Sequence, residues 1–404
     1  MEEWKTYTAQ EFCSNVTDGT HDSPKPKDSG HYLITSKHLQ SSGIDFSSAY
    51  KISDEDYQKV IKRSAVVQYD ILFSMIGTIG NTVRVTDAVV DFAVKNMAIF
   101  KMGGDEVKSK WMYYWLQSLK AKEYISSRLA GSTQSYLTLD SLRNFPVQAP
   151  SRHNMEKIVS VLSSFDDKIA LNNRINHNLE EQAQALYKSW FVDFEPFRGG
   201  EFVDSELGMI PAGWSVKSLG EVTKEIRDKV SARQDVKVLS PVTSGRLVLS
   251  EEFFTKQVFS ESIAKYLLVK PGDFAYNPAR VNIGSLGLNE YPFDGCVSPV
   301  YVVFRCESGY NHFFDLYRTT APFKDEVLSR SSGGVRQTLA YKDFALIRIV
   351  YPPRVVIASF NSLYEGLIAV QKSNLKENEI LSSQRDSLLP LLMSGQVLCV
   401  DLNC

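Results

Sequence analysis

The pattern in Asn172-Asn173-Arg174-Ile175-Asn176-His177-Asn178-Leu179, followed by Gln182 and Leu186, occurs twice in this chain and sets its architecture. About 200 residues later, the same residue types stand at the same spacing. The second copy consists of Asn374, Lys376, Asn378, Leu381, Gln384 and Leu388. A polar pattern this long is unlikely to recur by chance, so the chain is expected to contain two copies of one unit.

Other pairs of residues extend the repeat in both directions at nearly the same offset. These pairs are Trp4 with Trp214, Glu11 with Glu221, Asp70 with Asp273, Gln134 with Gln337, Asp140 with Asp343, and Pro150 with Pro353. Two copies of a unit of about 200 residues predict a pseudo-two-fold molecule, which suits a ligand with two similar halves.

An apolar seam with alternating three- and four-residue steps runs through the first copy of this pattern. Its members are Met155, Ile158, Leu162, Phe165, Ile169, Asn172, Asn176, Leu179, Ala183, Leu186 and Trp190. A second seam follows Pro353 and ends at Pro390 or continues briefly to Gly395. Its members are Ile357, Phe360, Tyr364, Leu367, Gln371, Asn374, Asn378, Leu381, Arg385 and Leu388. Heptad seams of this length predict two long paired helices.

Asparagine near the middle of each seam predicts how the helices pair. In an antiparallel pair the two middles meet, so Asn172 and Asn176 can bond Asn374 and Asn378. Buried amides of this kind fix register and orientation at some cost in stability. Each helix would extend about 57 Å at ~1.5 Å per residue. That length suits DNA half-sites ~34–36 Å apart.

The remaining sequence predicts two mixed α/β globules. In the first, strands are expected at residues 83–85 and 98–100 and a helix at 108–127. In the second, strands are expected at 264–269, 300–305 and 346–351 and a helix at 311–328. The predicted domains are 1–150 and 199–353, which are globular, and 151–198 and 354–404, which are helical. The fold class is therefore mixed α/β, with two globules separated by two long antiparallel coiled-coil helices in a pseudo-two-fold arrangement.

Composition limits the class of protein and the kind of partner. The 404 residues include 45 Lys or Arg and 47 Asp or Glu, and neither globule has an excess of basic residues. Any nucleic-acid contact must therefore use a local face. The chain shows neither a signal peptide nor a membrane-spanning apolar run, and its five cysteines form no disulfide or zinc pattern. A cytoplasmic protein without membrane contact is expected.

Two catalytic alternatives are weak. Asn277-Pro278-Ala279-Arg280 resembles a degraded adenine methyltransferase loop, and a plain turn explains it better. Asp91 with Glu106-Val107-Lys108, or Asp166-Asp167-Lys168, would fit a Mg²⁺ nuclease only loosely. Neither acidic group recurs in the second copy, and no ATP-binding loop is present. No metal site and no catalytic residue are predicted.

Polar loops at equivalent places in the two globules are the better candidates for function. Small residues admit phosphate close to the backbone, while Arg and Gln can bond guanine and adenine edges. A lysine-containing loop at 19–27 and Arg280 extend this set. The candidate DNA-binding residues are Lys25, Lys27, Arg128, Ser132, Gln134, Arg280, Arg330, Arg336 and Gln337.

Three segments carry a resemblance to known proteins: residues 168–194, which end Lys188-Ser189-Trp190-Phe191-Val192-Asp193-Phe194, residues 208–214 and residues 385–395. They resemble the specificity subunits of Type I restriction–modification systems, and residues 168–194 are similar to the central conserved region of that family. Residues 208–214 resemble the entry to its second recognition domain, and residues 385–395 resemble its conserved C-terminal end. The chain departs from the family pattern at 149–153 and 352–356, where each long helix begins.

The resemblance implies a DNA-binding subunit without catalysis of its own. Each globule would read one half of a bipartite double-stranded target, and the helices would set the gap between halves. Two methyltransferase subunits would dock on the helices, and restriction/translocase subunits would join them. S-adenosylmethionine, ATP and Mg²⁺ would belong to those partners. The alternatives are a self-contained methyltransferase or nuclease, and a helical scaffold that does not bind DNA.

Overall fold

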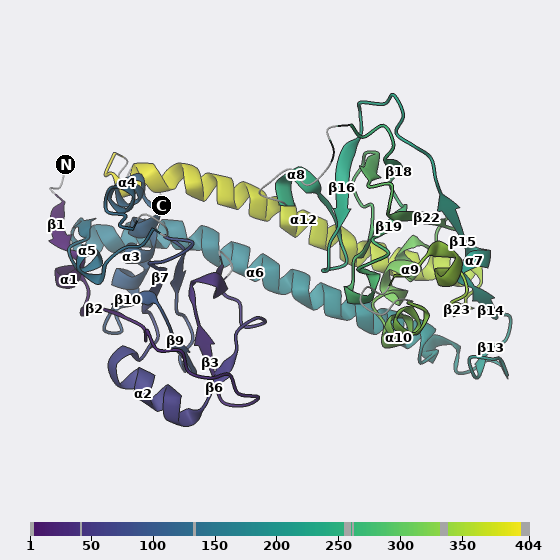
Figure 1. Ribbon diagram of the computed structural model, residues 1–404, viewed down its shortest axis with the longest axis horizontal. Helices are drawn as coiled ribbons and strands as arrows, with labels where there is room; N and C mark the ends of the chain where they lie inside the picture. The colour runs from purple at the N-terminus through teal and green to yellow at the C-terminus, as the bar shows by residue number, and fades with distance from the viewer. Residues whose placement is uncertain are drawn as a thin grey trace. The chain divides into compact units, whose positions relative to one another are not determined.

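The computed structural model describes residues 4–40, 43–131, 135–253, 260, 262–331 and 338–396 (Figure 1). Contacts divide the chain into two compact units. Unit 1 comprises Met1–Asn173 and Leu375–Cys404, and unit 2 comprises Arg174–Asn374. Both divisions fall inside long helices, so each unit combines a globule with parts of both helices.

Unit 1 contains short helices and strands ahead of its long-helix segments. The helices are α1 (Ala9–Phe12), the 3-10 turn η1 (Ser36–His38), α2 (Asp54–Ser64), α3 (Glu106–Gln117), α4 (Leu119–Ser127) and α5 (Leu139–Arg143). The strands are β1 (Lys5–Thr8), β2 (Asn15–Asp18), β3 (His31–Ile34), β4 (Leu39–Gln40), β5 (Gly43–Ile44), β6 (Lys51–Ile52), β7 (Ile71–Ser74), β8 (Thr82–Arg84), β9 (Phe92–Val94), β10 (Met97–Lys101) and β11 (Pro146–Ala149).

The main sheet of unit 1 has the strand order β2-β10-β7-β8 and is antiparallel. A second sheet has the order β6-β3-β9, in which β3 and β9 run parallel. β1 pairs with β11, which joins the two ends of the globule's chain. Alternate side chains of a strand point to opposite faces, so the central strands β7 and β10, covered on both faces, carry buried residues almost throughout.

Unit 2 has a corresponding set of elements. Its helices are α7 (Leu219–Val222), α8 (Ser250–Phe253), the 3-10 turn η3 (Val281–Ile283), α9 (Asn311–Tyr317), α10 (Ala321–Arg330) and α11 (Tyr341–Phe344); another 3-10 turn is η2 (Glu195–Phe197). Its strands are β12 (Phe202–Val203), β13 (Ile210–Pro211), β14 (Ser215–Ser218), β15 (Thr223–Ile226), β16 (Lys237–Pro241), β17 (Leu247–Leu249), β18 (Leu267–Val269), β19 (Phe274–Tyr276), β20 (Leu286–Leu288), β21 (Gly295–Val297), β22 (Val302–Cys306) and β23 (Arg348–Tyr351).

The sheets of unit 2 follow the plan of unit 1. The order β15-β22-β19-β20 matches β2-β10-β7-β8, and β14 pairs with β23 as β1 pairs with β11. In the second sheet, β16 runs parallel to β21 as β3 runs parallel to β9. The internal repeat inferred from polar residues is therefore also a repeat of strand order.

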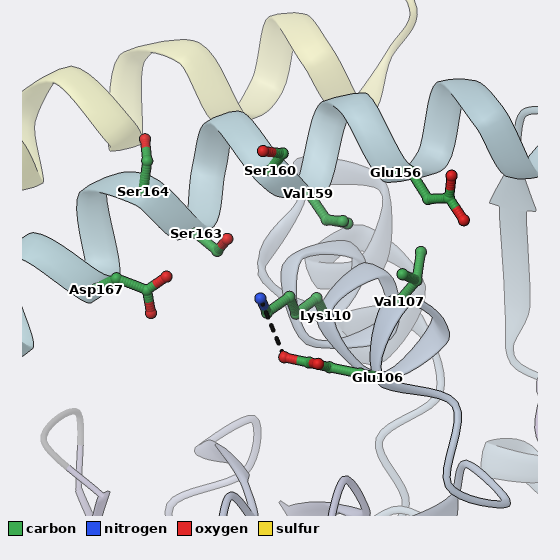
Figure 2. A pocket seen from close by; sticks show the side chains of 9 residues that line it. All are labelled: Glu106, Val107, Lys110, Glu156, Val159, Ser160, Ser163, Ser164 and Asp167. Atoms are coloured by element: carbon green, nitrogen blue, oxygen red, sulfur yellow. Dashed lines mark ion pairs between the residues drawn. The ribbon is translucent and has the colours of Figure 1, made fainter.

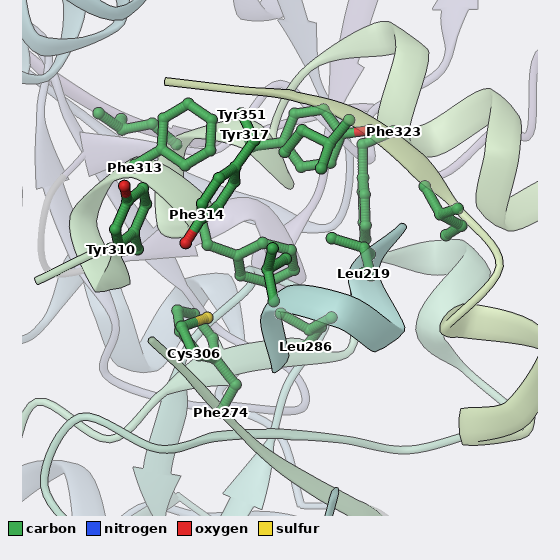
Figure 3. Close-up of a cluster of buried hydrophobic side chains, with 14 of the residues drawn as sticks. Leu219, Phe274, Leu286, Cys306, Tyr310, Phe313, Phe314, Tyr317, Phe323 and Tyr351 are labelled. Atoms are coloured by element: carbon green, nitrogen blue, oxygen red, sulfur yellow. The ribbon is translucent and has the colours of Figure 1, made fainter. Parts of the chain in front are cut away.

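The core of unit 2 is rich in aromatic side chains (Figure 3). Phe274 stacks on Phe304 with ring centroids 5.2 Å apart, and Phe314 meets both rings edge-on. Tyr351 stacks on Tyr310 in the same cluster, with ring centroids 4.4 Å apart. Buried aromatic rings contribute large apolar areas, so this cluster fixes α9 and β23 against the main sheet.

The two long helices are α6 (Arg152–Phe191) and α12 (Arg354–Met393), each of 40 residues. Every residue of the two predicted seams is buried or half-buried. α12 continues through Pro390 to Met393, so the helix does not end at the proline.

Within each unit, the α6–α12 contacts run in opposite chain directions. In unit 1, Asn172 Nδ2 donates to Asn378 Oδ1 at 2.9 Å and to Glu377 Oε2 at 2.7 Å. In the same unit, Arg385 donates to Asp166 at 2.5 Å. In unit 2, Asn374 Nδ2 donates to Asn176 Oδ1 at 2.8 Å. Each of the four asparagines thus bonds an asparagine of the other long helix within its own unit.

The helices predicted inside the globules are each broken once. The expected helix 108–127 divides at Ser118, whose extended backbone ends α3 and whose side chain accepts from Ala121 N to cap α4. The expected helix 311–328 divides before Thr320, which caps α10 in the same way. The serine cap interrupts the first helical pattern without Gly or Pro, so periodicity alone missed that break. At the second break, Pro322 in the first turn of α10 was a signal that the apolar periodicity did not register.

The strands predicted in unit 2 begin later than expected. They start at Leu267, Val302 and Arg348. In the second of these, a turn in which Tyr301 N donates to Ser298 O at 3.0 Å precedes the strand. The apolar residues ahead of these strands belong to turns. The sequence pattern of β-branched and aromatic residues is the same in the turn and in the strand, so it does not show where the strand begins.

Candidate nucleic-acid interface

One edge of the unit 1 sheets gathers loops from distant parts of the chain. β2 and β7 end at this edge and β10 begins there, because Asp18 pairs with Ala98 and Ser74 with Met97. The second sheet contributes the ends of β3 and β9, since Lys95 N donates to Ile34 O at 2.8 Å. We call the segments that follow these strand ends, together with the segment after α4, the unit 1 loop edge. They are residues 19–23, 35–38, 75–80 and 95–96 after the strands, and residues 128–131 after α4.

Backbone contacts hold these segments together. Thr20 forms a bridge with Lys95, and Ile76 and Ala130 both form bridges with Tyr136. Gly19 lies so close to β9 that a Cβ atom would meet Val94 O at 2.3 Å. The unit 1 loop edge is therefore a fixed surface, although its first and last segments are more than a hundred residues apart in the sequence.

Basic side chains stand on this surface. Lys37 is exposed in η1, and Arg63 at the end of α2 donates to Gly19 O at 2.8 Å while remaining 59% exposed. Burial lowers the pKa of His38, and the neighbouring Lys37 adds to the effect. The charge of η1 at neutral pH thus comes from Lys37, since the buried imidazole is uncharged.

Unit 2 repeats this edge with different side chains. β15 and β19 end where β22 begins, as shown by the pairs Ile226 with Val303 and Tyr276 with Val302. The hairpin between β16 and β17 and the turn after β21 lie at the same edge. We call residues 227–229, 242–246, 277–285 and 298–301 the unit 2 loop edge. Its exposed basic residues are Arg227, Lys229, Arg246 and Arg280.

Two glycines allow the long loop of unit 2 to approach its neighbour. Gly284 has φ +96°, and a Cβ there would meet Thr243 O at 2.6 Å. A Cβ at Gly287 would meet the Arg246 backbone at the same distance. Ser285 Oγ donates to Pro241 O at 2.6 Å, which joins the loop to β16. The guanidinium-bearing segments at 246 and 280 are thereby held side by side.

Five of the predicted DNA-binding residues fall in the described part of the chain. Lys25 and Lys27 are exposed in the loop that continues from residue 23. Arg128 caps α4 with its guanidinium 5.5 Å from the Tyr124 ring centroid, and Arg280 is exposed in its turn. Arg330 ends α10 and donates to Glu326 at 2.7 Å, so its charge is already partly neutralised.

Ser132, Gln134, Arg336 and Gln337 lie outside the described residues, and their role as base-reading residues stays a prediction. Sequence reasoning missed the exposed basic residues Lys37, Arg63, Arg227 and Arg246. Each lies in or near a turn, so the residues typical of turns around them could have marked them as surface positions. Sequence order alone does not tell which turns share an edge, because that depends on the order of strands in the sheets.

The groups considered for catalysis have structural partners. Asn277 Oδ1 accepts from Ala279 N at 3.0 Å, which closes a local turn, and the preceding Tyr276 is buried in the core. Asp91 pairs with His31, whereas Lys108 donates to Phe12 O at 3.2 Å. The expected turn at Asn277 is confirmed.

The acidic pair on α6 also has structural partners. Asp166 accepts from the Tyr114 hydroxyl at 2.6 Å and from Arg385, and Lys168 pairs with Glu377 at 3.2 Å. Over the ranges that the structure describes, no three His, Cys, Asp or Glu side chains form a potential metal site. Likewise, no described helix is long and apolar enough to cross a membrane.

A polar pocket of about 410 Å³ lies between α3 and α6 in unit 1 (Figure 2). Ser160, Ser163 and Ser164 contribute to its lining from α6. Charged groups at its rim pair with near neighbours, Glu106 with Lys110 at 3.1 Å and Glu156 with Arg152 at 2.8 Å. These pairings make the pocket a hydrophilic gap between two helices.

Comparisons with known proteins agree on one family. Residues 1–181 match the Type I restriction modification DNA specificity domain. The MjaIX specificity subunit of Methanocaldococcus jannaschii is 28% identical over 305 residues, covering 72% of this chain and 70% of the relative. The HindI specificity subunit of Haemophilus influenzae is 22% identical over 408 residues, covering 83% of this chain and 88% of the relative. In each of these comparisons the chain is similar to the specificity subunits of Type I restriction–modification systems.

A solved member of this family has the same fold. The crystal structure of the Type I restriction–modification S subunit from M. genitalium has a TM-score of 0.54 and 14% sequence identity to this chain. The likeness covers 97% of this chain and 96% of that one. The matched family model associates residues 1–181 with DNA specificity, in agreement with the resemblance seen in the sequence.

Proposed function

We propose that this chain is a specificity subunit and reads a bipartite double-stranded DNA target through its two loop edges. One observation carries the proposal: the same sheet edge gathers loops and exposed basic residues in both units, although the loop sequences differ. Two units with the same strand order but different exposed side chains are suited to bind two DNA half-sites that differ in sequence. Basic side chains neutralise phosphate and position the protein, while polar side chains read base edges.

We further propose that α6 and α12 pair as an antiparallel coiled coil with pseudo-two-fold symmetry and set the gap between half-sites. The asparagine contacts in each unit support this reading, since the pair Asn172–Asn378 and the pair Asn374–Asn176 are related by the sequence repeat. Polar seam residues of this kind specify register in paired helices.

The helices also offer surfaces for two methyltransferase subunits, which restriction/translocase subunits would join. Exposed apolar side chains occur on them in both units, including Leu171 and Ile380 in unit 1 and Leu363 and Val370 in unit 2. In unit 2, a groove of about 540 Å³ lies between α6 and the α9–α10 segment, with Tyr187 and Val192 in its lining. Exposed apolar surface of this kind marks protein contacts.

S-adenosylmethionine, ATP and Mg²⁺ are assigned to those partner subunits, and the complex is proposed to be cytoplasmic. The chain should therefore transfer no methyl group and cleave no DNA when purified alone.

The test is methylome sequencing of cells that express this chain with its methyltransferase subunits. A split motif with two specific halves is expected. Lys37→Ala with Arg128→Ala should weaken recognition through unit 1, and Arg246→Ala with Arg280→Ala through unit 2. Each lost phosphate contact should reduce the slope of log affinity against log salt by about 1. A lost base contact should instead relax one position of the motif.

Matched control variants are available in both units. Lys5, changed in Lys5→Ala, lies on β1, outside the main sheet. Lys342, changed in Lys342→Ala, lies on α11, which packs near the start of β15, whereas the loop edge is at the end of β15. Both should leave affinity and motif unchanged. An unsplit motif, or loop-edge variants that behave like these controls, would contradict the proposal.

A further inference from the structure

An exposed isoleucine stands among the basic residues of the unit 2 loop edge. Ile283 ends η3 and is 53% exposed, three residues after Arg280. A single exposed apolar residue is ordinary on a protein surface. Here its position is informative, because the surface around it is lined with guanidinium groups that suit DNA.

The backbone under Ile283 is held rigidly. Arg280 N donates to Asn277 O, Ser285 N to Arg280 O, and Asn277 N to Ser285 O, all within 3.1 Å. Val281, in the same turn, is buried in the aromatic core. Gly284, the next residue, packs against Thr243 through its positive φ. A side chain presented by such a turn loses little conformational freedom when it meets a ligand.

The chemistry of DNA limits what an apolar side chain can recognise there. Phosphates, sugars and most base edges present charged or hydrogen-bonding groups. In the major groove, thymine alone adds an apolar group, its 5-methyl, which alkyl side chains contact.

We propose that Ile283 reads a thymine by packing against its 5-methyl group in the half-site bound by unit 2. This inference rests on the proposed function and deepens it, since it names a base and a residue. Arg280 and Arg246, on the segments beside it, hold the backbone so that the isoleucine meets the base edge.

The experiment replaces thymine with deoxyuridine, which removes only the methyl group. The complete complex of this chain with its methyltransferase subunits is assayed on duplexes carrying the motif found by methylome sequencing. Every thymine of both half-sites is replaced, one at a time and on both strands. One position in one half-site should lower affinity about three- to fivefold, the factor expected for losing one buried methyl group.

The isoleucine is assigned by comparing variants on the same duplexes. Ile283→Ala should bind thymine and deoxyuridine equally at that position, while keeping the preferences of the native complex elsewhere. Leu346→Ala is the matched control, because Leu346 is 57% exposed in unit 2 but lies just before β23, away from the loop edge. It should retain the full methyl dependence.

Several results would overturn the inference. The native complex could bind every deoxyuridine duplex with unchanged affinity, or the unit 2 half-site could contain no A·T pair. The Ile283→Ala complex could also still bind thymine more tightly than deoxyuridine. Loss of the preference in Val300→Ala instead would assign the contact to that residue of the unit 2 loop edge, which is 72% exposed. In all these cases the split motif would persist, so the proposed function would stand. Its own failure would appear earlier, as the absence of sequence-specific methylation.

Discussion

At the scale of single residues, the repeat preserves a buried carboxylate at the start of a central strand. Asp70 and Asp273 are fully buried at equivalent positions. Asp273 accepts from Arg305 at 2.6 and 2.9 Å and from Lys270 N at 2.9 Å. Asp70 pairs with Lys101 in the same way. Both acids lie at the opposite end of their strands from the loop edge, so they stabilise the scaffold and do not face the proposed DNA site.

We predict that Asp273→Asn lowers the free energy of unfolding by about 1–3 kcal/mol, because the buried amide cannot satisfy the guanidinium and backbone donors together. Urea unfolding would measure this change. Asp235→Asn, which removes an exposed partner of Arg233, should leave the free energy of unfolding almost unchanged. The DNA motif should stay the same in both variants, and a changed motif in Asp273→Asn would place the carboxylate in recognition.

The sequence predicted residues of the helices better than residues of the loop edges. Asn172 and Asn378 were predicted to meet because a heptad seam and a repeat suffice to align them. Lys37 and Arg246 were missed because their neighbours are set by strand order, which brings together segments far apart in the chain. The polar loops at Arg128 and Arg330 were located by recurrence alone. Recurrence marks equivalent places but not the groups around them, and Arg330 already pairs with Glu326.

At the scale of elements, the long helices are the best-predicted feature because their periodicity extends over many turns. For the globules, the sequence predicted the mixed α/β fold class but not the bounds of the individual helices and strands. Caps at Ser118 and Thr320 divided the expected helices, and turns shortened the expected strands. Such local hydrogen bonds compete with helix formation, and a pattern of apolar residues does not register them.

A prediction at this scale concerns the amide pair of unit 1. Asn172→Leu should destabilise the chain by about 1–2 kcal/mol, because Asn378 Oδ1 loses its donor at a half-buried position. The double variant Asn172→Leu with Asn378→Leu should recover that loss or exceed it, since an apolar pair packs well in a seam. Thermal unfolding would compare the single and double variants.

A second readout separates this hydrogen bond from packing. The hydrogen bond from Asn172 lowers the pKa of Glu377, and Lys168 adds to the effect. Asn172→Leu should therefore raise that pKa toward its usual value, measured by NMR titration. Asn178→Leu, an exposed change on the same helix, should alter neither quantity. A double variant less stable than Asn172→Leu alone would show that the amides contribute more than register.

At the scale of the whole molecule, the repeat predicts an architecture but not a target. Strand order recurs in both units, whereas the exposed residues of the loop edges do not, as Lys37 in one and Arg246 in the other illustrate. The scaffold follows from apolar and turn residues that any copy must retain. The DNA sequence that each unit reads depends on a few exposed side chains. Those side chains alone do not reveal which bases they contact.

The proposed role of the helices leads to a prediction about the gap between half-sites. Residues 170–176 contain Asn172 and Asn176, and residues 372–378 contain Asn374 and Asn378. Duplicating both heptads in place preserves the seam phase and gives each original asparagine a partner in the opposite copy. The helix pair would lengthen by about 10 Å at ~1.5 Å per residue. At ~3.4 Å per base pair, the gap should widen by up to about three base pairs.

Methylome sequencing would measure this gap, and both half-sequences should be unchanged because neither loop edge is altered. Activity should fall, since about three added base pairs rotate one half-site by roughly 100° around the duplex. Duplicating only one heptad is the control, because it leaves seven residues without partners and should abolish specific methylation. A doubly lengthened chain that methylates the original spacing and rejects wider gaps would show that the helices do not set the distance. The spacing would then have to come from the partner subunits, and the repeated asparagines would serve pairing alone.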